Sequence, residues 1–181
     1  MKARQGTARR YAKALFMITR DAGTGETAAR ELERFQEVIR QSPELGTVLG
    51  RPWVKPAERH AVALAVAERV GCGRTVRDLV ALVASRGRMD HLREIVEAYR
   101  ALVDEAAGRV RAVVRTAVPL IEDERRRLAG RLERALGKQV ILEESVDASL
   151  LGGFVAQVGS LILDGSLDGQ LQRMRERLAR G

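Results

Sequence analysis

The sequence predicts a mainly α-helical protein, with an N-terminal six-helix bundle over residues 1–105 and a small α/β domain over residues 108–181. Two observations predict this division. Apolar residues recur at helical spacing in successive segments up to about residue 105. From Gly108 the period changes to alternation, because Val110, Ala112 and Val114 are separated by single residues, as in a strand.

The composition supports a globular chain that can bury a core, since its 181 residues are 45% hydrophobic and 31% charged. No window approaches the roughly 18 consecutive apolar residues of a membrane span. The N-terminal segment lacks the sustained apolar region of a signal peptide and the length of an organelle presequence. The single cysteine, Cys72, fits a reducing compartment and is expected to be a small packing residue.

The formal net charge of +8 comes almost entirely from arginine and allows two interpretations. One is a nucleic-acid-binding or anionic-membrane surface. The other is an ordinary solvated surface. The arginines are spread along the chain among acidic residues, and aromatic residues make up only 3%, so few rings are present to stack on bases. This favours the solvated surface, and a basic helical nucleic-acid-binding protein is the alternative function.

The first predicted helix, from Thr7 to Thr19, carries two apolar stripes where a helix on a bundle surface needs only one. It is therefore either a central helix or one that offers a second face to a partner. The first stripe contains Ala8, Ala12, Leu15, Phe16 and Thr19, and the second contains Tyr11, Ala14 and Ile18.

Three further helices are predicted over Thr27–Arg40, Pro43–Leu49 and Pro56–Val70. Ser42 is expected to cap the second of these, because it precedes a proline and an acidic residue. Trp53 is expected to pack against the bundle from the connection to the third.

The fifth helix, Thr75–Ser85, is again apolar on two sides. Leu82 faces away from its main stripe, and Asp90 is expected to cap the sixth helix. The main stripe of the fifth helix contains Val76, Leu79, Val80 and Val83.

The second half reads as strand, helix, strand, hairpin and helix. A helix is predicted over Glu122–Leu136, with no Ser or Thr cap because Ile121 precedes it. The hairpin strands are Phe154–Val158 and Leu161–Leu163, separated by the two-residue turn Gly159–Ser160. The remaining strand includes Val140, Ile141 and Leu142. Ser166 caps the last helix, whose residues Leu167, Leu171, Met174 and Leu178 are expected to face inward.

No residues form a recognisable catalytic, cofactor or metal site. The Gly152–Gly153 pair is not followed by a lysine or a helix, so it is interpreted as a close backbone approach and not as a phosphate loop. His60 and His91 lack ligand spacing. Asp147 and Asp164 have simpler roles in turns. The prediction is a protein that is not an enzyme and has no catalytic residue, no cofactor and no metal.

What remains is a surface for binding helices. The stripes of the first and fifth helices can line a groove for an amphipathic partner helix. Alternatively, they complete the core of the bundle, and the residues alone leave both possibilities open. The candidate groove residues are Tyr11, Ala14, Leu15, Ile18, Val76, Leu79, Val80 and Val83.

A long gapped pattern near the C-terminus resembles the signature of the F-type ATP synthase delta subunit, whose mitochondrial counterpart is the oligomycin-sensitivity-conferring protein. Ser160 departs from it, where an acidic or amide residue is expected. Other segments of the chain resemble the same family. The matching residues are Val146-Asp147, Gly152-Gly153-Phe154, Gly159, Asp164-Gly165-Ser166 and Gln170-Leu171, with Arg9 to Phe16, Arg86-Gly87-Arg88, Thr116-Ala117 and Pro119-Leu120 elsewhere.

The resemblance implies a non-catalytic stator subunit in the peripheral stalk of the F1Fo ATP synthase, which couples proton-driven rotation to ATP synthesis. It implies that the groove holds the N-terminal helix of an alpha subunit of the catalytic head. The second domain then holds the C-terminal ends of the membrane-anchored b subunits, with Leu171, Met174 and Leu178 as contacts. The implied location is the cytoplasmic face of a bacterial inner membrane.

Overall fold

The computed structural model describes residues 2–51, 53–159 and 161–180. Within it the chain forms two compact units, residues 1–103 and residues 104–181, and each unit has its own hydrophobic core. Each unit is therefore a separate folded body, and the two are described in turn.

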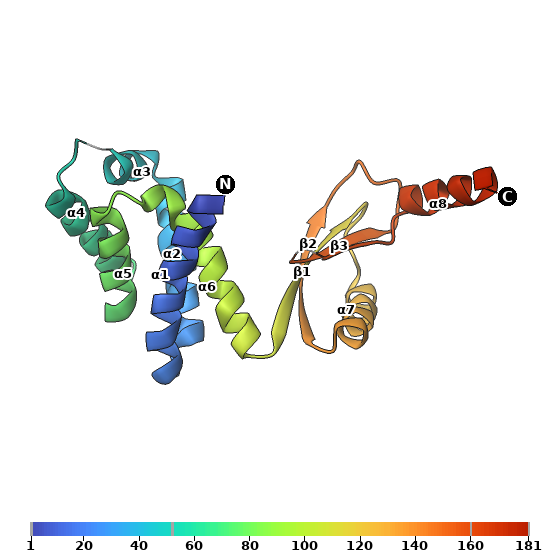
Figure 1. The fold of residues 1–181 in the computed structure, drawn as a ribbon, viewed down its shortest axis with the longest axis horizontal. Coiled ribbons are helices and arrows are strands. Elements are labelled where there is room, and N and C mark those ends of the chain that lie inside the picture. The colour runs from blue at the N-terminus through green and yellow to red at the C-terminus, as the bar shows by residue number, and fades with distance from the viewer. Residues whose placement is uncertain (1, 52, 160, 181) are drawn as a thin grey trace. The chain divides into compact units, whose positions relative to one another are not determined.

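The described part of the first unit contains six α-helices and one short 3₁₀ helix, so the six helices predicted from the apolar spacing are confirmed (Figure 1). Helix α5 packs against α4 and α1, and α2 packs against α1, α3 and α5. The helices are α1 (Lys2–Asp21), α2 (Gly25–Gln41), α3 (Pro43–Gly50), α4 (Pro56–Arg69), α5 (Arg74–Ser85), the 3₁₀ helix η1 (Met89–His91) and α6 (Leu92–Ala106), which ends beyond the unit boundary.

A buried hydroxyl pair joins three helices of this core. The Thr19 hydroxyl of α1 lies 2.8 Å from the Tyr99 hydroxyl of α6, which also lies 3.2 Å from the carbonyl oxygen of Gly25 at the start of α2. Thr19 also donates to the Leu15 carbonyl oxygen at 2.9 Å. Because buried hydroxyls need partners, these bonds fix α1 against α2 and α6.

Two local predictions in this unit are wrong. Ser42 precedes α3, but its side chain makes no capping bond, since Pro43 occupies the first helical position and begins the helix without it. Trp53 is 72% exposed and has the Arg51 guanidinium 4.8 Å from its ring centroid, so it does not pack into the bundle.

The second unit is a four-stranded sheet with strand order β2-β1-β3-β4. Strands β1 and β2 are parallel and are joined through α7, whereas β3 pairs antiparallel with β1 and with β4. The predicted hairpin is therefore confirmed in its strands, although Ser160 of its turn lies outside the described residues. The elements are β1 (Arg109–Thr116), α7 (Glu122–Leu136), β2 (Gln139–Val146), β3 (Phe154–Val158), β4 (Leu161–Asp164) and α8 (Leu167–Arg180).

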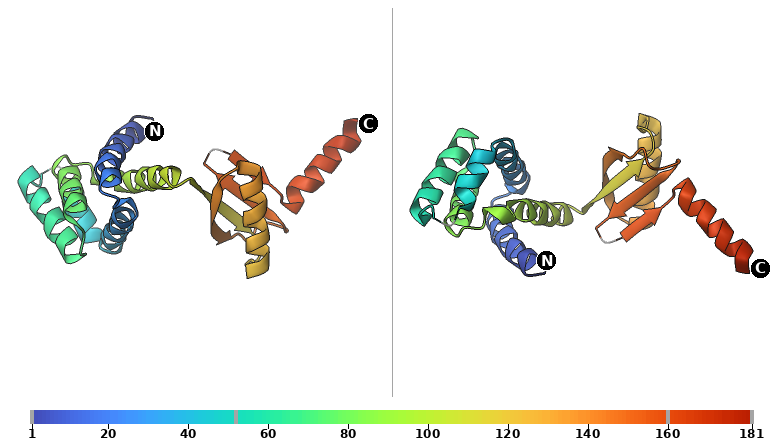
Figure 2. Two further views of the ribbon diagram at one scale, coloured as in Figure 1. Left: turned by 90° about the horizontal axis from the view of Figure 1, so that it is seen from below. Right: turned by 90° about the horizontal axis from the view of Figure 1, so that it is seen from above.

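Helix α7 covers one face of the sheet (Figure 2). The core under it contains Leu128 and Leu132 of α7 with Ala112, Val114 and Ala156 of the strands. Ala112 and Val114 of β1 are spaced by two, as required for side chains that point to the same face, and Ala156 of β3 pairs with Val114. The alternation predicted from Val110 onward therefore places its apolar members under α7.

Acidic side chains at the start of α7 replace the missing Ser or Thr cap. The Ile121 amide donates to Glu124 Oε2 at 3.2 Å. The Leu120 amide donates to Glu144 Oε1 at 2.6 Å, and Arg125 donates to the second oxygen of Glu144. The amides of the two residues just before the helix thus have side-chain partners, and that of Ile121 is one of those that a helix start leaves without an internal partner. Glu144 comes from β2, so the helix start is fixed by the sheet.

Candidate partner-binding surfaces

Helix α1 has one face in the core and one face exposed. Ala8, Ala12 and Leu15 are buried, as expected for the stripe that packs inward. On the other face, Ala14 is exposed and Ile18 is 58% exposed. Two of the three residues of the second stripe are therefore available to a partner, whereas Leu15 is not.

Tyr11, the third residue of that stripe, is half-buried and is held by the segment after α5. Arg88 donates to the Tyr11 hydroxyl at 3.1 Å, and its guanidinium carbon lies 5.9 Å from the ring centroid. This contact joins α1 to the end of α5. Tyr11 therefore has a structural role that the sequence pattern alone did not indicate.

The stripe predicted on α5 lies mostly inside the bundle. Val76, Val80 and Val83 have almost no exposed surface, and Leu79 is 9% exposed. These side chains therefore lie in the core beneath α1 and α5 and do not line a surface. The apolar residue that α5 does expose is Leu82, at 43%. In the sequence Leu82 lies off the main apolar stripe of this helix. An apolar residue off the buried stripe is the signal that could have identified it as exposed.

The apolar stripe of α8 is exposed, so the expectation that it faces inward is wrong. Leu171 is 51% exposed, Met174 is 59% exposed and Leu178 is 83% exposed. Leu167, in the first turn, is exposed as well. Figure 1 shows α8 extending from the end of β4 instead of lying across the sheet of its unit. The helix therefore presents a stripe that its own domain does not cover.

The junction between β4 and α8, at Asp164–Gly169, is tightly packed around glycines. A Cβ atom on Gly153 would lie 2.4 Å from the Gly165 carbonyl oxygen, and one on Gly169 would lie 2.6 Å from the Asp164 carboxylate. The Leu167 amide donates to the Gly152 carbonyl oxygen at 3.0 Å. The interpretation of the Gly152–Gly153 pair as a close backbone approach is thus confirmed, and its neighbour is the start of α8.

Ser166 caps α8 as predicted. Its hydroxyl accepts a hydrogen bond from the Gly169 amide at 3.0 Å. The same hydroxyl donates to Asp164 Oδ1 at 2.6 Å, and the Ser166 amide donates to that oxygen at 2.9 Å. At the other side of the junction, the Leu151 amide donates to Asp168 at 3.3 Å. Four hydrogen bonds therefore fix the first turn of the helix.

Asp147 repeats the arrangement of Asp164, since each accepts from the amide and hydroxyl of a serine two residues later. For Asp147 these bonds come from Ser149, at 3.0 and 2.6 Å. The serine hydroxyl is the largest cause that lowers the pKa of each carboxyl group, followed by the serine amide. Both aspartates are thus turn residues, as predicted, and not a catalytic carboxylate pair.

The described residues contain no group of three His, Cys, Asp or Glu side chains arranged to hold a metal ion. Cys72 is buried, and burial raises the pKa of its thiol.

The helices in the described ranges are too short or too polar to cross a membrane.

Comparison with known proteins decides the family. The family described as ATP synthase delta (OSCP) subunit matches residues 7–178. The chain is 42% identical over 171 residues to ATP synthase subunit delta of Anaeromyxobacter sp. (strain Fw109-5), which covers 94% of the chain and 96% of that protein. The corresponding protein of Myxococcus xanthus is 38% identical, with 94% and 95% covered. The chain belongs to the ATP synthase delta (OSCP) subunit family.

A solved structure supports the same fold. A chain of the Toxoplasma gondii mitochondrial ATP synthase hexamer superposes with a TM-score of 0.75 and 18% identity, covering 95% of this chain and 97% of that one. The resemblance found in the sequence is thus confirmed. Delta subunits are structural subunits of the peripheral stalk, so the function is that of a non-catalytic stator and not of an enzyme. This favours the stator over the nucleic-acid-binding alternative.

Proposed function

We propose that the chain joins two partners of the ATP synthase through two separate surfaces. The first is the α1–α5 surface, made of Ala14, Met17 and Ile18 with Leu82, which would bind the N-terminal helix of an alpha subunit. The second is the α8 stripe, made of Leu171, Met174 and Leu178, which would bind the C-terminal ends of the b subunits. The first unit then faces the catalytic head and the second faces the stalk.

The exposed apolar residues of α1 support the first assignment. Met17 and Ile18 are adjacent and more than half exposed, although the rest of α1 follows an ordinary inward pattern. The buried valines of α5 and the Thr19–Tyr99 bond hold the helices beneath this surface in one packed arrangement. A rigid support lowers the entropic cost of binding an amphipathic helix.

The single observation that carries the proposal is the uncovered stripe of α8. Its three apolar residues recur at a spacing of three and four, so they share one helix face. A helix normally gains most of its stability by burying such a face. In this unit the described residues leave that face exposed, and a partner helix of the stalk would cover it.

A stator must transmit torque between a head that does not turn and a membrane anchor. This task requires two binding surfaces and stiffness, and it requires no reactive side chain. We place the chain at the cytoplasmic face of a bacterial plasma membrane, where it would act as a peripheral subunit held by its partners.

One binding experiment tests both assignments. The full chain is titrated with a peptide from the alpha N-terminus and with a soluble C-terminal fragment of b. Ile18→Asp is expected to weaken the alpha peptide by more than about tenfold and to leave the b fragment unchanged, because buried apolar anchors dominate such interfaces. Met174→Asp is expected to do the reverse.

Ala65→Asp is the matched control, since Ala65 is exposed on α4 and lies on neither surface. Leu79→Asp is not a suitable probe, because Leu79 is in the core and a charge there would destabilise the bundle. If Ile18→Asp bound the alpha peptide as tightly as the Ala65→Asp control, the assignment of the α1–α5 surface would be wrong.

A further inference from the structure

The positive charge of the protein is concentrated in its first unit. Residues 1–103 contain 19 Lys and Arg against 12 Asp and Glu, a formal net charge of +7, whereas residues 104–181 contain 13 against 12, a net charge of +1. Helix α1 alone contains six basic residues and one acidic residue, so it carries +5. The excess of positive charge therefore comes mainly from the helix that exposes Met17 and Ile18.

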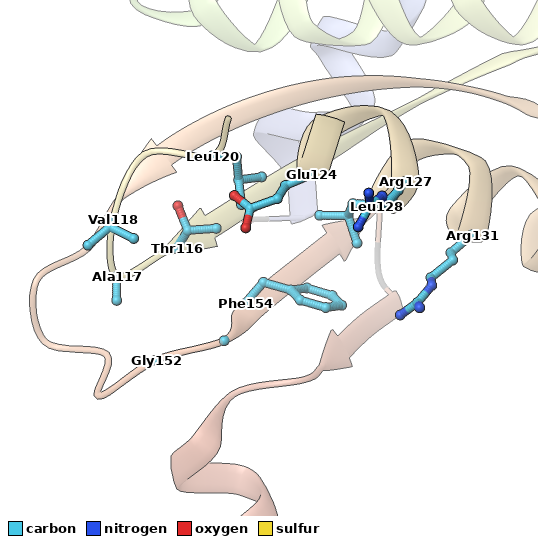
Figure 3. A pocket seen from close by; sticks show the side chains of 11 residues that line it. Thr116, Ala117, Val118, Leu120, Glu124, Arg127, Leu128, Arg131, Gly152 and Phe154 are labelled. Carbon is cyan, nitrogen blue, oxygen red and sulfur yellow. The ribbon is translucent and has the colours of Figure 1, made fainter. Parts of the chain in front are cut away.

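Helix α7 shows that arginine content alone does not produce such an excess. It contains five arginines, but it also contains four acidic residues, three of them in its first turn. The cavity of about 350 Å³ that α7 forms with the segment leading into β3 is lined by Glu124 as well as by Arg127 and Arg131 (Figure 3). The cations of α7 thus have acidic neighbours on the same helix, and those of α1 mostly do not.

Two cations of α1 lie beside its exposed apolar residues. Arg10, Ala14 and Met17 are spaced by four and three, so they share one face of the helix, and Lys13 precedes Met17 by four. Arg10 and Lys13 are both exposed. Arg10 donates to the Thr7 hydroxyl at 3.3 Å, and neither cation forms an ion pair with another described residue.

The end of α5 adds further positive charge at the same place. Arg88 donates to the Tyr11 hydroxyl at 3.1 Å, so the segment after α5 lies beside the residue that follows Arg10. Arg86, two residues earlier, is exposed and follows Leu82 by four residues. Ile18 lies about 12 Å beyond Arg10 along α1, from the rise of 1.5 Å per residue. The α1–α5 surface therefore has a cationic end and an apolar end.

The carboxylates of these elements already have cationic neighbours. Helices α1 and α5 contain one acidic residue each, Asp21 and Asp78. Asp21 lies 3.1 Å from the preceding arginine, and Asp78 lies 3.9 Å from Arg74. After α5, Asp90 lies 3.7 Å from the imidazole of the next residue. The charge around the surface is thus positive on balance, which favours an acidic partner.

We propose that the α1–α5 surface binds an amphipathic helix that carries carboxylates at one end of its apolar stripe. The carboxylates would lie at Arg10, Lys13 and Arg86, and the stripe would run from there along Ala14 to Ile18. This rests on the proposed assignment of the surface to a partner helix, and it adds the charge and the direction of that helix. The N-terminal helix of the alpha subunit is then expected to be acidic at one end.

A basic amphipathic helix is also typical of membrane-surface and nucleic-acid binding. A helix that lies on a membrane inserts a broad apolar face, but the broad apolar face of α1, with Ala8, Ala12 and Leu15, is in the bundle core. Phosphate contacts would gain nothing from the exposed Met17 and Ile18. The narrow apolar strip between two helices favours a partner helix.

The test measures association and dissociation rates, because exposed charges mainly change the association rate. The probes are two synthetic helices of about 18 residues, since shorter isolated helices are marginal. Both carry the same leucine stripe, and one has glutamates at one end where the other has lysines. The full chain should bind the glutamate helix at least about tenfold faster in 50 mM salt. The difference should nearly vanish at about 1 M salt, where the screening length is about 3 Å.

Matched variants separate this surface from the overall charge. Arg10→Gln/Lys13→Gln should slow association of the glutamate helix by about threefold or more and leave its dissociation nearly unchanged. Arg30→Gln/Arg34→Gln removes the same charge from exposed positions on α2 and should change the association rate by less than about twofold. A nitroxide at the glutamate end should broaden the NMR signals of Tyr11 more than those of Ile18.

Equal rates for the two probes, or equal slowing by the two double variants, would overturn the proposal. Stronger broadening at Ile18 would overturn the direction. Phosphatidylglycerol vesicles or a DNA duplex that bound through Arg10 and Lys13, with no binding of the glutamate helix, would overturn the assignment to a partner helix.

The alpha peptide is measured beside the two probes, so that the proposed function is tested separately. An alpha peptide that bound at a rate independent of salt would overturn this proposal and leave the proposed function standing. An alpha peptide that did not bind, with the glutamate helix still bound through Arg10 and Lys13, would support this proposal and contradict the assignment to alpha.

Discussion

Helices α1 and α8 have similar sequence patterns but opposite environments. Both are amphipathic, yet α1 buries Ala8, Ala12 and Leu15 in the bundle, whereas Leu171, Met174 and Leu178 of α8 are all more than half exposed. Amphipathic periodicity therefore indicates that a helix will bury a face, and it does not tell whether the covering surface belongs to the same chain.

The two helices also differ in what keeps them in place. Helix α1 is held along its length by side chains of the bundle and by the Thr19–Tyr99 bond. Helix α8 has 14 residues, a length at which an isolated helix is marginal, and its described hydrogen bonds to the rest of the unit lie at its N-terminal end and near Arg173. Its direction therefore depends on the junction at Asp164–Gly169.

The largest expected contrast is between Leu15→Ala and Leu171→Ala. Leu15 is buried, so its truncation should lower the free energy of unfolding of the first unit by about 2–5 kcal/mol. Leu171 is 51% exposed, so its truncation should change the stability of the second unit by less than about 0.5 kcal/mol. Urea unfolding monitored by NMR signals of each unit measures both. A large loss with Leu171→Ala would mean that α8 packs on its own domain.

A second contrast uses two glycines of the second unit. Gly153 and Gly159 both have positive φ values, +78° and +59°. Alanine at Gly159 meets no atom within 4 Å and should cost only about 1–2 kcal/mol of backbone strain. Alanine at Gly153 would press on the Gly165 carbonyl oxygen, so it should cost roughly 1–3 kcal/mol more.

The same two variants also report on the junction from which α8 begins. Amide exchange should become faster in the first turn of α8 in Gly153→Ala, and it should be unchanged there in Gly159→Ala. Equal stability losses in the two variants would show that the contact between Gly153 and Gly165 does not hold the junction.

The smallest expected effect is a pH dependence at the same junction. The pKa of Asp164 is lowered from 3.8 in the folded protein, chiefly by the Ser166 hydroxyl. Its stabilisation is therefore fully present above the unfolded value and is lost as the pH falls through the lower, folded value. Protection of the Ser166 amide should fall below about pH 3.8.

Asp164→Asn should abolish this pH dependence at Ser166 and leave that of Ser149 unchanged. Asp147→Asn is the reciprocal control, because Asp147 makes the same bonds to Ser149. Loss of the pH dependence at both serines in either single variant would indicate a general acid transition and not a local one.

Much of the fold follows from local patterns. The break in period at Gly108, the hairpin strands and the Ser166 cap depend on residues that are close in the chain, and the structure confirms all three. The cap predicted at Ser42 failed although it used the same reasoning, because Pro43 begins the helix without a side-chain cap.

The site was predicted less well than the fold. The stripe of α5 was offered as a surface, but Val76, Val80 and Val83 are core residues, and Leu82 is the exposed one. The contact between Arg88 and Tyr11 was not predicted, because α1 and the segment after α5 come together only in the folded unit. No spacing in the chain relates these segments.

By itself the sequence determined the helices, the strands and the family, because periodicity, turn residues and the glycine signature are properties of neighbouring residues. Only the tertiary structure decided which apolar faces are covered. Burial depends on how segments distant in the chain approach each other. The apolar stripe of α5 is buried by the rest of the bundle, whereas the apolar stripe of α8 is exposed.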